Sequence, residues 1–294
     1  MPDELLIPKE KNVTEKGALY LVGTPIGNMA DITERAVKVL GDADFVAAED
    51  TRNSGLMLSR LGLRKPLVPY HEHNKVTKGP EIVERLRAGE TCALVTDAGM
   101  PAISDPGEDL VRLCAEAGIP VHPVPGACAA VSALAVSALP TNHFIFEGFL
   151  PALGKERRER LAYVSSLPDT CILYEAPHRL RKTLADLREA CGDDRPVALC
   201  RELTKLNEDV TRITLGEACR KYEETEPRGE YVLILGAKPA GAPAVPEESG
   251  APLTVRERVE AYVVQGLSVK DAIKTVAKEL GVPKNDVYSE IKKK

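Results

Sequence analysis

The chain has 294 residues, of which 44% are hydrophobic and 28% charged, and its formal net charge at pH 7 is −5. This length and composition predict about two domains with a substantial core, and the negative charge argues against indiscriminate binding to polyanions. No apolar run approaches the roughly 20 residues of a membrane helix. The polar residues 1–16 contain no hydrophobic secretory segment and are predicted to form a flexible leader.

The seven cysteines are scattered along the chain, several of them in apolar runs, and none forms a CxxC pair. This pattern is typical of small buried residues in a reducing compartment and disfavours a disulfide framework or a zinc site. The sequence therefore predicts a cytoplasmic protein.

Short apolar runs alternate with amphipathic segments over residues 17–126, which we interpret as a first α/β domain. Strands are predicted at 18–23, 43–49, 91–96 and 119–125. Helices are predicted at 32–40, 80–89 and 107–118. Short strands separated by helices indicate βαβ crossovers, so we expect a mostly parallel sheet.

Residues 127–237 have a different pattern and predict a second α/β domain that begins with a small-residue helix at 127–139. Strands are predicted at 143–150, 170–176, 196–203, 209–216 and 230–237. Helices are predicted at 155–165, 178–190 and 217–224. Since the last two strands are joined only by the short helix, we expect a mixed sheet.

The C-terminal part of the chain differs from both α/β segments. Residues 238–252 are rich in proline, glycine and alanine and predict a linker. Residues 253–294 predict a small helical domain with the rhythm of a helix-turn-helix. Its helices are expected at 254–265, 268–280 and 283–293.

Four loops follow strands of the first domain and are rich in small or polar residues. They are GTPIGN (23–28), EDTRNSG (49–55), TDAGMPAISDPG (96–107) and PGACAA (125–130). Ligands of open α/β sheets bind at the carboxyl ends of the strands, where such loops converge. We therefore expect the four loops to surround one cleft.

Several motifs allow more than one interpretation. Pro25 removes an amide from GTPIGN, which matches neither a dinucleotide nor an NTP loop, so a plain turn remains open there. Asp97 stands at a strand end and is a ligand candidate, whereas Asp105 precedes a Pro-Gly pair and is interpreted as a turn cap. The HxH pair in residues 71–75 lacks a third ligand at a suitable spacing, so a polar substrate-facing loop is favoured and no metal is predicted.

Eight segments occur in an order that carries a family resemblance. They are LYLVGTPIGN, ADFVAAEDTR, TDAGMPAISDPG, PVPGACA, FEGFLP, YEAPHR, CRELTK and GEYVLIL. Together they resemble the ribosomal RNA small subunit methyltransferase I family, a branch of the tetrapyrrole (precorrin/uroporphyrinogen) methylase superfamily. The resemblance covers about residues 17–237, and AEDTR, DAGMPAISDPG and YEAPHR are its most specific segments.

The resemblance implies a class III methyltransferase fold of two α/β domains that is usually dimeric. It implies that S-adenosylmethionine binds in a folded conformation between the domains. The implied reaction is 2′-O-methylation of a cytidine ribose in the decoding region of 16S ribosomal RNA. The implied partners are this RNA or the small ribosomal subunit and a second copy of the chain, with no membrane.

The positions that match the cofactor site of the family come from both domains. They are Pro25, Asp97, Gly99, Ile103, Cys128, Ala129, Tyr174 and Tyr231. The resemblance places Pro25 near the methionine end of the cofactor. Cys128 stands where relatives commonly have serine, so a backbone contact is expected there in place of a hydroxyl bond. Tyr174 and Tyr231 lie in segments that would contact adenine and ribose through backbone groups.

The catalytic candidates lie in strand-end motifs. A ribose hydroxyl is a weak acid, so a general base would assist its attack on a methyl group. The candidates for proton transfer are Glu49, Asp50, Glu175, His178, Glu202 and Lys205. Their spacing does not distinguish among them. Arg52, Arg179 and Arg201 suit phosphates or a flipped-out nucleotide, and a structural ion pair within EDTR at a helix start remains open.

Two alternatives to this interpretation stay open, and so do two roles for the C-terminal tail. A tetrapyrrole methylase shares the fold and the cofactor but would not need EDTR, APHR or a basic tail. A non-catalytic RNA-binding protein would leave the converging loops unexplained. The tail, with Lys270, Lys274, Lys278, Lys284 and a terminal KKK, could bind RNA phosphates or form a small solubilising or protein-contacting bundle.

Overall fold

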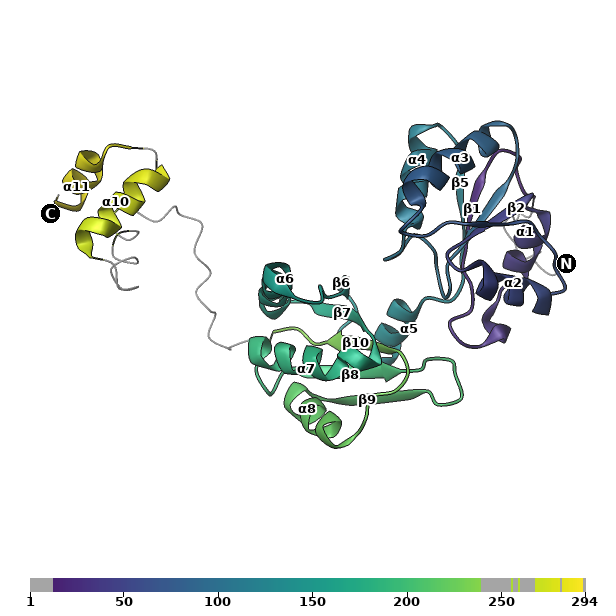
Figure 1. Cartoon of the computed structure of the whole chain (residues 1–294). Helices are drawn as coiled ribbons and strands as arrows, with labels where there is room; N and C mark the ends of the chain where they lie inside the picture. The colour runs from purple at the N-terminus through teal and green to yellow at the C-terminus, as the bar shows by residue number, and fades with distance from the viewer. Residues whose placement is uncertain (1–12, 239–254, 256–258, 260–267, 281, 293–294) are drawn as a thin grey trace, which may run out of the picture. The chain divides into compact units, whose positions relative to one another are not determined.

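The computed structural model describes residues 13–238, 255, 259, 268–280 and 282–292. The chain falls into two compact units, Met1–Pro239 and Ala240–Lys294 (Figure 1). Two five-stranded sheets lie in the larger unit, which confirms the predicted α/β class. None of the helices described is long and apolar enough to cross a membrane.

The first sheet is parallel throughout and has the strand order β3-β2-β4-β1-β5. Its strands are β1 (Leu19–Val22), β2 (Phe45–Ala48), β3 (Leu67–Pro69), β4 (Cys92–Val95) and β5 (Val121–Val124). Every residue of β2 and β4 is buried, as is typical of parallel strands covered on both faces. The predicted parallel sheet is confirmed, with β3 as an additional edge strand.

Helices cover both faces of the first sheet. They are η1 (Met29–Asp31), α1 (Glu34–Asp42), α2 (Thr51–Arg60), α3 (Lys75–Arg87) and α4 (Gly107–Glu116). Successive strand residues point to opposite faces, so Tyr20 packs with α1 and α2 while Leu19 packs with α3 and α4. The carboxyl ends of the strands therefore project from a core that is packed on both sides.

Helix α2 corrects the prediction of a loop at EDTRNSG. The helix begins at Thr51 and has Asp50 as its N-cap, whose side chain accepts a hydrogen bond from the Arg52 backbone amide at 2.8 Å. Such a cap satisfies one of the free amides in the first helical turn. Five of the seven residues of the motif are thus helical, and only its first two form the strand-end loop.

Helix α3 begins at Lys75, five residues before the predicted start, and includes Pro80. The preceding HEHNK segment forms a turn in which Asn74 Oδ1 accepts a hydrogen bond from the His71 amide at 2.9 Å. The His71 and His73 ring centroids lie 6.0 Å apart. The predicted substrate-facing loop is therefore a turn that leads into α3, and it does not line the cavity described below.

The second sheet has the order β6-β7-β10-β8-β9 and is mixed, as predicted. Its strands are β6 (Phe144–Phe149), β7 (Thr170–Glu175), β8 (Pro196–Arg201), β9 (Asp209–Thr214) and β10 (Tyr231–Leu235). β6 and β7 pair in parallel, and the other neighbours pair antiparallel. Its helices are α5 (Ala129–Val136), α6 (Gly154–Ser166), α7 (Pro177–Cys191) and α8 (Leu215–Glu224). α5 packs on one face of the sheet, and α6, α7 and α8 pack on the other (Figure 1).

The end of the predicted leader is attached to the first sheet. The Glu15 amide donates a hydrogen bond to the Tyr20 hydroxyl at 2.8 Å, and Thr91 Oγ1 donates one to the Glu15 carbonyl at 3.1 Å. The predicted leader 1–16 is therefore corrected at its C-terminal end, which is held by these bonds. Residues 1–12 lie outside the described part of the chain.

The smaller unit contains α10 (Val269–Leu280) and α11 (Lys284–Lys292) in its described part. Ile273, Val276 and Val287 belong to the buried cluster that joins the two helices. The bounds of α10 and α11 agree with two of the three helices predicted for this region. Most of the predicted linker and of the predicted first tail helix, and the side chain of Lys278, lie outside the described residues. Exposed lysines on α10 and α11 are Lys270, Lys274 and Lys284.

Candidate functional site

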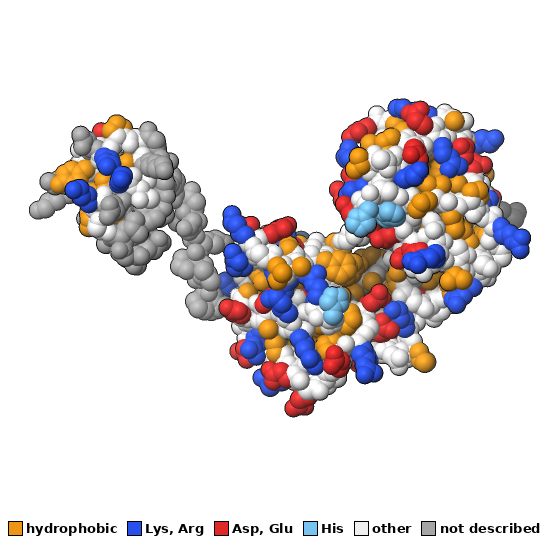
Figure 2. Space-filling model, viewed as in Figure 1, with side chains coloured by type: hydrophobic (Ala, Val, Ile, Leu, Met, Phe, Trp, Pro, Cys, Tyr) orange, Lys and Arg blue, Asp and Glu red, His pale blue; other side chains and the backbone are white. Residues whose placement is uncertain are grey.

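A cavity of about 490 Å³ lies in the larger unit, where loops of the first sheet meet β7, β8 and β10 of the second. Figure 2 shows a hollow in this unit with hydrophobic side chains on its walls. The volume is within the range of about 300–1,000 Å³ that is usual for small-molecule and cofactor sites. All four predicted loops contribute lining residues, so their predicted convergence is confirmed.

The structure brings most of the predicted site residues together in this cavity. From the predicted cofactor set, its lining contains Asp97, Gly99, Ile103, Cys128, Ala129, Tyr174 and Tyr231. From the candidates for proton transfer, it contains Glu49, Glu175, Glu202 and Lys205. Residues from both halves of the unit therefore surround one hollow.

Other predicted residues do not line the cavity. Pro25 is half-buried and lies one residue before Ile26, which does line it. Asp50 and Arg52 are engaged in the cap of α2, and His178 is exposed in the first turn of α7. Arg179 and Arg201 are also absent from the lining. These six residues therefore lie outside the cavity lining, and their predicted roles stay predictions.

The loop 96–107 is tied to the GTPIGN loop by a pair of backbone hydrogen bonds. The Thr24 amide donates to the Gly99 carbonyl at 2.9 Å, and the Gly99 amide donates to the Thr24 carbonyl at 3.1 Å. Gly99 has φ of 86°, a left-handed conformation that glycine adopts without steric cost. The strand-end loop is therefore fixed next to the first strand of the sheet.

Asp105 closes the far end of the same loop, as its predicted role as a turn cap requires. Its Oδ1 accepts hydrogen bonds from the Ala102 amide at 3.0 Å and from the Gly107 amide at 2.7 Å. Ala102 and Ser104 have φ of 69° and 61°. Non-glycine residues rarely adopt this conformation unless their surroundings impose it, and such residues cluster at ligand sites. The loop is therefore a preformed wall.

The GTPIGN and PGACAA loops touch through two glycines. A Cβ atom at Gly23 would lie 2.7 Å from the Gly126 Cα atom. No side chain fits between backbones at this separation, so both positions require glycine. The close approach brings the N-terminus of α5, with Cys128 as its N-cap, to the cavity.

Glu49 and Asp50 are neighbours in sequence but have different surroundings. Glu49 lines the cavity, and its Oε2 accepts a hydrogen bond from Thr96 Oγ1 at 2.9 Å. Asp50 pairs with Arg52, with Nη2 and Oδ2 2.6 Å apart. The side-chain hydrogen bond from Arg52 is the main cause that lowers the pKa of Asp50 to about 2. The structural ion pair that the sequence left open is therefore observed, and Glu49 is the acid of this motif that faces the cavity.

Lys205 lines the cavity and is held between two carboxylates. Its Nζ lies 2.9 Å from Glu202 Oε1 and 2.8 Å from Glu230 Oε2. Burial alone would lower the pKa of Lys205, but the hydrogen bonds to Glu230 and Glu202 outweigh it and raise the pKa. A Cβ atom at Gly27 would lie 2.4 Å from Lys205 Cγ, so the lysine stem packs on the GTPIGN loop. Lys205 is a fixed cation that joins the two halves of the cavity.

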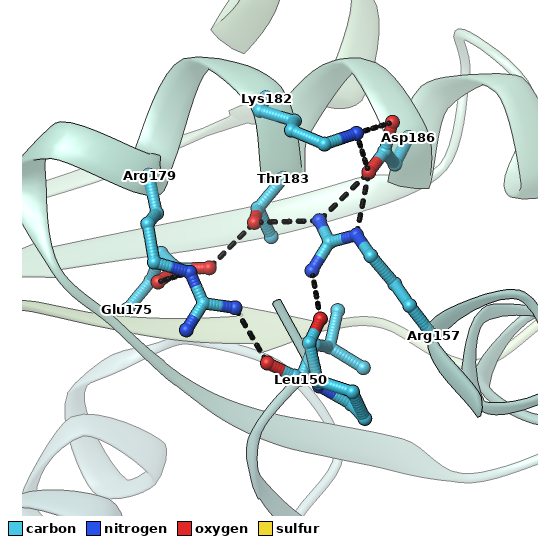
Figure 3. A network of polar contacts seen from close by, with 8 residues as sticks. Leu150, Arg157, Glu175, Arg179, Lys182, Thr183 and Asp186 are labelled. Carbon is cyan, nitrogen blue, oxygen red and sulfur yellow. Dashed lines mark hydrogen bonds and ion pairs between the residues drawn. The ribbon is translucent and has the colours of Figure 1, made fainter. Parts of the chain in front are cut away.

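Glu175 is the most buried of the catalytic candidates and is 2% exposed. Its Oε2 accepts a hydrogen bond from Thr183 Oγ1 at 2.5 Å, and its Oε1 accepts one from the Ala176 amide at 2.9 Å. Arg179 Nε lies 3.3 Å from the same Oε1. Both carboxylate oxygens are therefore occupied, which supports a positioning role for Glu175 between β7 and α7 (Figure 3).

The contacts of Glu175 continue into a buried polar network (Figure 3). Arg157, 4% exposed, donates to Thr183 Oγ1 at 3.0 Å and to Asp186 Oδ2 at 2.8 Å. Lys182 Nζ lies 3.0 Å from the same Asp186 oxygen. A buried guanidinium requires such partners because burying an unpaired charge is costly. The network joins α6 to α7 behind the cavity wall.

Some lining residues are not among the predicted site residues. They include Thr96, Met100, Ser104, Phe149 and Glu230. Each lies within or directly beside a motif quoted for the family resemblance, so proximity to a motif was the available signal. Among the residues that the structure describes, no group of three or more His, Cys, Asp or Glu side chains is placed to hold a metal ion.

Comparison with known proteins assigns the family. The family model of tetrapyrrole (corrin/porphyrin) methylases matches residues 18–219. Over 276 residues the chain is 48% identical to the ribosomal RNA small subunit methyltransferase I of Halalkalibacterium halodurans, with 94% of each chain covered. The chain belongs to the ribosomal RNA small subunit methyltransferase I family of the tetrapyrrole methylases.

Solved structures of other tetrapyrrole methylases have the same fold. A uroporphyrin-III C-methyltransferase from Thermus thermophilus is 25% identical, with a TM-score of 0.53, and the match covers 75% of this chain and 94% of that chain. A structure of such an enzyme from the same organism in complex with S-adenosylhomocysteine is 21% identical, with a TM-score of 0.53, over 74% of this chain and 97% of that chain. Membership of this methyltransferase family confirms the predicted fold and the predicted cofactor, S-adenosylmethionine.

Proposed function

We propose that this chain transfers a methyl group from S-adenosylmethionine to the 2′ oxygen of a cytidine ribose in the decoding region of 16S ribosomal RNA. The observation that carries the proposal is the single cavity in which the four predicted loops meet the second sheet. The name of the relative from Halalkalibacterium halodurans, 48% identical over 94% of the chain, supports ribosomal RNA as the acceptor.

The residues of the cavity fit S-adenosylmethionine. Asp97 is exposed at the end of β4 and supplies a carboxylate for the ammonium or the ribose hydroxyls of the cofactor. Ile103, Ala129 and Tyr174 supply apolar surface for the adenine and the methionine chain, and the backbone around Gly99 and Tyr231 supplies hydrogen-bonding groups. When bound, S-adenosylmethionine supplies a methyl group that its sulfonium makes electrophilic.

Glu49 is the side chain we assign to accept the proton of the ribose hydroxyl. It lines the cavity, and Thr96 orients its Oε2. No described residue forms a hydrogen bond with its other oxygen, Oε1, that would compete with a substrate hydroxyl. Lys205 is unsuited to this task because its raised pKa keeps it protonated, and Glu175 has both oxygens engaged.

The proposed partners are ribosomal RNA or the small subunit and a second copy of the chain, in the cytoplasm. Arg52, three residues after the cavity residue Glu49, exposes 87% of its side chain and suits a phosphate contact. The exposed lysines of α10 and α11 suit further phosphate contacts. Phosphate contacts position a nucleic acid, and the cavity selects the nucleotide that reacts.

The test is methyl transfer from labelled S-adenosylmethionine to three acceptors, namely unmodified small subunits, naked 16S ribosomal RNA and uroporphyrinogen. We expect label in RNA and, after nuclease digestion, in a cytidine carrying a 2′-O-methyl group. Label in the tetrapyrrole would identify a tetrapyrrole methylase. Label on a base of the RNA, with none on ribose, would refute the proposed acceptor atom.

A further inference from the structure

Phe149 is a large aromatic side chain that is exposed inside the cavity. It lines the cavity, yet 53% of its surface is accessible. Its ring centroid lies 5.5 Å from that of Tyr174, whose ring in turn lies 5.2 Å from that of Phe146. Aromatic side chains usually bury most of their surface, so an aromatic ring left open within a cavity is suited to contact a ligand.

A β-bulge directs Phe149 to this face of the sheet. In the pairing of β6 with β7 the register shifts between Phe146 and Gly148, so that Phe146 pairs with Ile172 and Phe149 pairs with Tyr174. Successive strand residues alternate between faces, and one extra residue exchanges the faces for all that follow. Without the bulge, Phe149 would point to the α6 and α7 face. With it, Phe149 lies on the side of α5 and the cavity.

Two arginines of the buried network hold the backbone that follows Phe149. Arg179 Nη2 donates a hydrogen bond to the Leu150 carbonyl at 2.5 Å, and Arg157 Nη1 donates one to the Pro151 carbonyl at 2.8 Å (Figure 3). Hydrogen bonds from charged donors are stronger than neutral ones. Glu175 forms an ion pair with Arg179. The network thus supports the position of Phe149, and neither of the two arginines lines the cavity.

The loop 96–107 reaches β6 directly beside Phe149. A Cβ atom at Gly148 would lie 2.9 Å from Ser104 Oγ, so the loop packs on the bulge. Ile103, the residue before Ser104, also lines the cavity and is 50% exposed. An acceptor that rests on Phe149 therefore lies next to the loop that we assign to the cofactor, as methyl transfer requires.

We propose that Phe149 is the stacking surface for the base of the acceptor nucleotide, which is held out of the RNA stack when it enters the cavity. This role rests on the proposed function and extends it to recognition of the nucleobase. Enzymes that do chemistry on a base take the nucleotide out of the stack and hold its base against aromatic or apolar side chains. A flat, uncharged base matches an exposed phenyl ring with no polar group at its edge, and the transfer to ribose leaves the base free to stack.

The experiment compares two RNA acceptors that differ only at the target nucleotide, one intact and one abasic with its ribose retained. Phe149→Ala should lower kcat/KM on the intact acceptor by about 5- to 150-fold, as expected from the loss of one base–aromatic stack. On the abasic acceptor the same change should have little effect, because the stack is already missing. Phe149→Tyr, which keeps the ring, should restore the rate.

Phe144→Ala is the matched control, because Phe144 lies at the other end of β6, is 45% exposed and does not line the cavity. It should not change either rate. If Phe149→Ala lowered kcat/KM equally on both acceptors, or weakened binding of S-adenosylhomocysteine, the stacking role of Phe149 would be wrong. The proposed function would not be affected. Failure of the wild-type protein to methylate any RNA would overturn the proposed function and this role with it.

Discussion

Thr96 Oγ1 donates a hydrogen bond to Glu49 Oε2 at 2.9 Å, and this bond joins the ends of β4 and β2 at the cavity wall. Proton uptake by a positioned carboxylate typically contributes about 100-fold or more to a rate. Glu49→Gln should therefore lower kcat by about 100-fold and leave the affinity for S-adenosylhomocysteine unchanged. Thr96→Val should lower kcat less, and Thr96→Ser should retain it. A Glu49→Gln variant that transfers the methyl group at the wild-type rate in single-turnover kinetics would show that Glu49 does not accept the proton.

Asp97 is expected to hold the cofactor and to contribute little to folding, because its side chain is exposed at the end of β4. Loss of a hydrogen bond to a charged group costs about 1.5–3 kcal/mol. Asp97→Ala should therefore weaken binding of S-adenosylhomocysteine by about 10- to 100-fold, measured by calorimetry, with an unchanged Tm. Asp194→Ala, an exposed aspartate in the turn before β8, is the control. An unchanged affinity of the Asp97 variant would exclude this role.

Lys205 is expected to stabilise the cavity wall as a permanent cation. Lys205→Met leaves Glu202 and Glu230 facing each other without the ammonium between them, and like charges in close proximity repel. We expect weaker binding of S-adenosylhomocysteine and a lower Tm, both partly restored when Glu230→Gln is added. Lys38→Met, which removes an exposed i,i+4 ion pair on α1, should change neither quantity. The absence of any rescue would show that the three charges are not coupled.

Asp186 should contribute stability that depends on pH. Burial alone would raise its pKa, but Lys182 and Arg157 outweigh burial and lower the pKa below the ordinary value of 3.8. A lowered pKa in the folded state stabilises the fold above the ordinary pKa, and this contribution is lost as the pH falls through the folded value. Asp186→Asn should lower the free energy of unfolding by about 2 kcal/mol at neutral pH, since the buried Arg157 loses its carboxylate partner.

Denaturant unfolding at several pH values checks this expectation. The difference between wild type and Asp186→Asn should be constant above about pH 5 and should shrink as the pH falls below the ordinary pKa. Glu189→Gln, an exposed acid on the same helix, should show almost no difference at any pH. A difference for Asp186→Asn that stays constant down to acid unfolding would contradict the lowered pKa.

The smaller unit is expected to contribute to RNA affinity through its exposed lysines. A chain that ends at Pro239, the boundary of the larger unit, should bind S-adenosylhomocysteine as the full chain does. Its RNA affinity should be lower and should depend less steeply on salt, because fewer counterions are released from phosphates. Filter binding at several salt concentrations measures both effects. If the shortened chain and the full chain had equal RNA affinity and equal salt dependence, the smaller unit would not contribute to RNA binding.

The strand and helix pattern of the larger unit is predictable from the sequence because its strands are buried and its helices are amphipathic. Helix α2 could not be predicted in this way, because Gly55 and several polar residues lower its helix propensity. Burial of Ser54 and Leu58 in the folded unit stabilises it. Helix α3 includes Pro80, whereas proline favours a first helical turn, and its predicted start is therefore too late.

The convergence of the loops is likewise predictable, because strand ends of a parallel sheet meet at one edge. The hydrogen-bond and ion-pair partners of individual side chains are not predictable from the sequence, because many of them come from distant parts of the chain. Arg52, for example, forms a local ion pair with Asp50 and does not line the cavity. Phe149 faces the cavity only because of a one-residue bulge in β6. Gly148 is the residue in the sequence that hints at this bulge.

Transfer of labelled methyl from S-adenosylmethionine to unmodified small subunits, followed by mapping of the labelled nucleotide, tests the central claim most directly. We expect one labelled cytidine in the decoding region of 16S ribosomal RNA, with the label on the ribose 2′ oxygen and with a lower rate of labelling in Asp97→Ala at limiting S-adenosylmethionine. A label that persists at full rate in Asp97→Ala, or that resides only in a tetrapyrrole, would contradict this expectation.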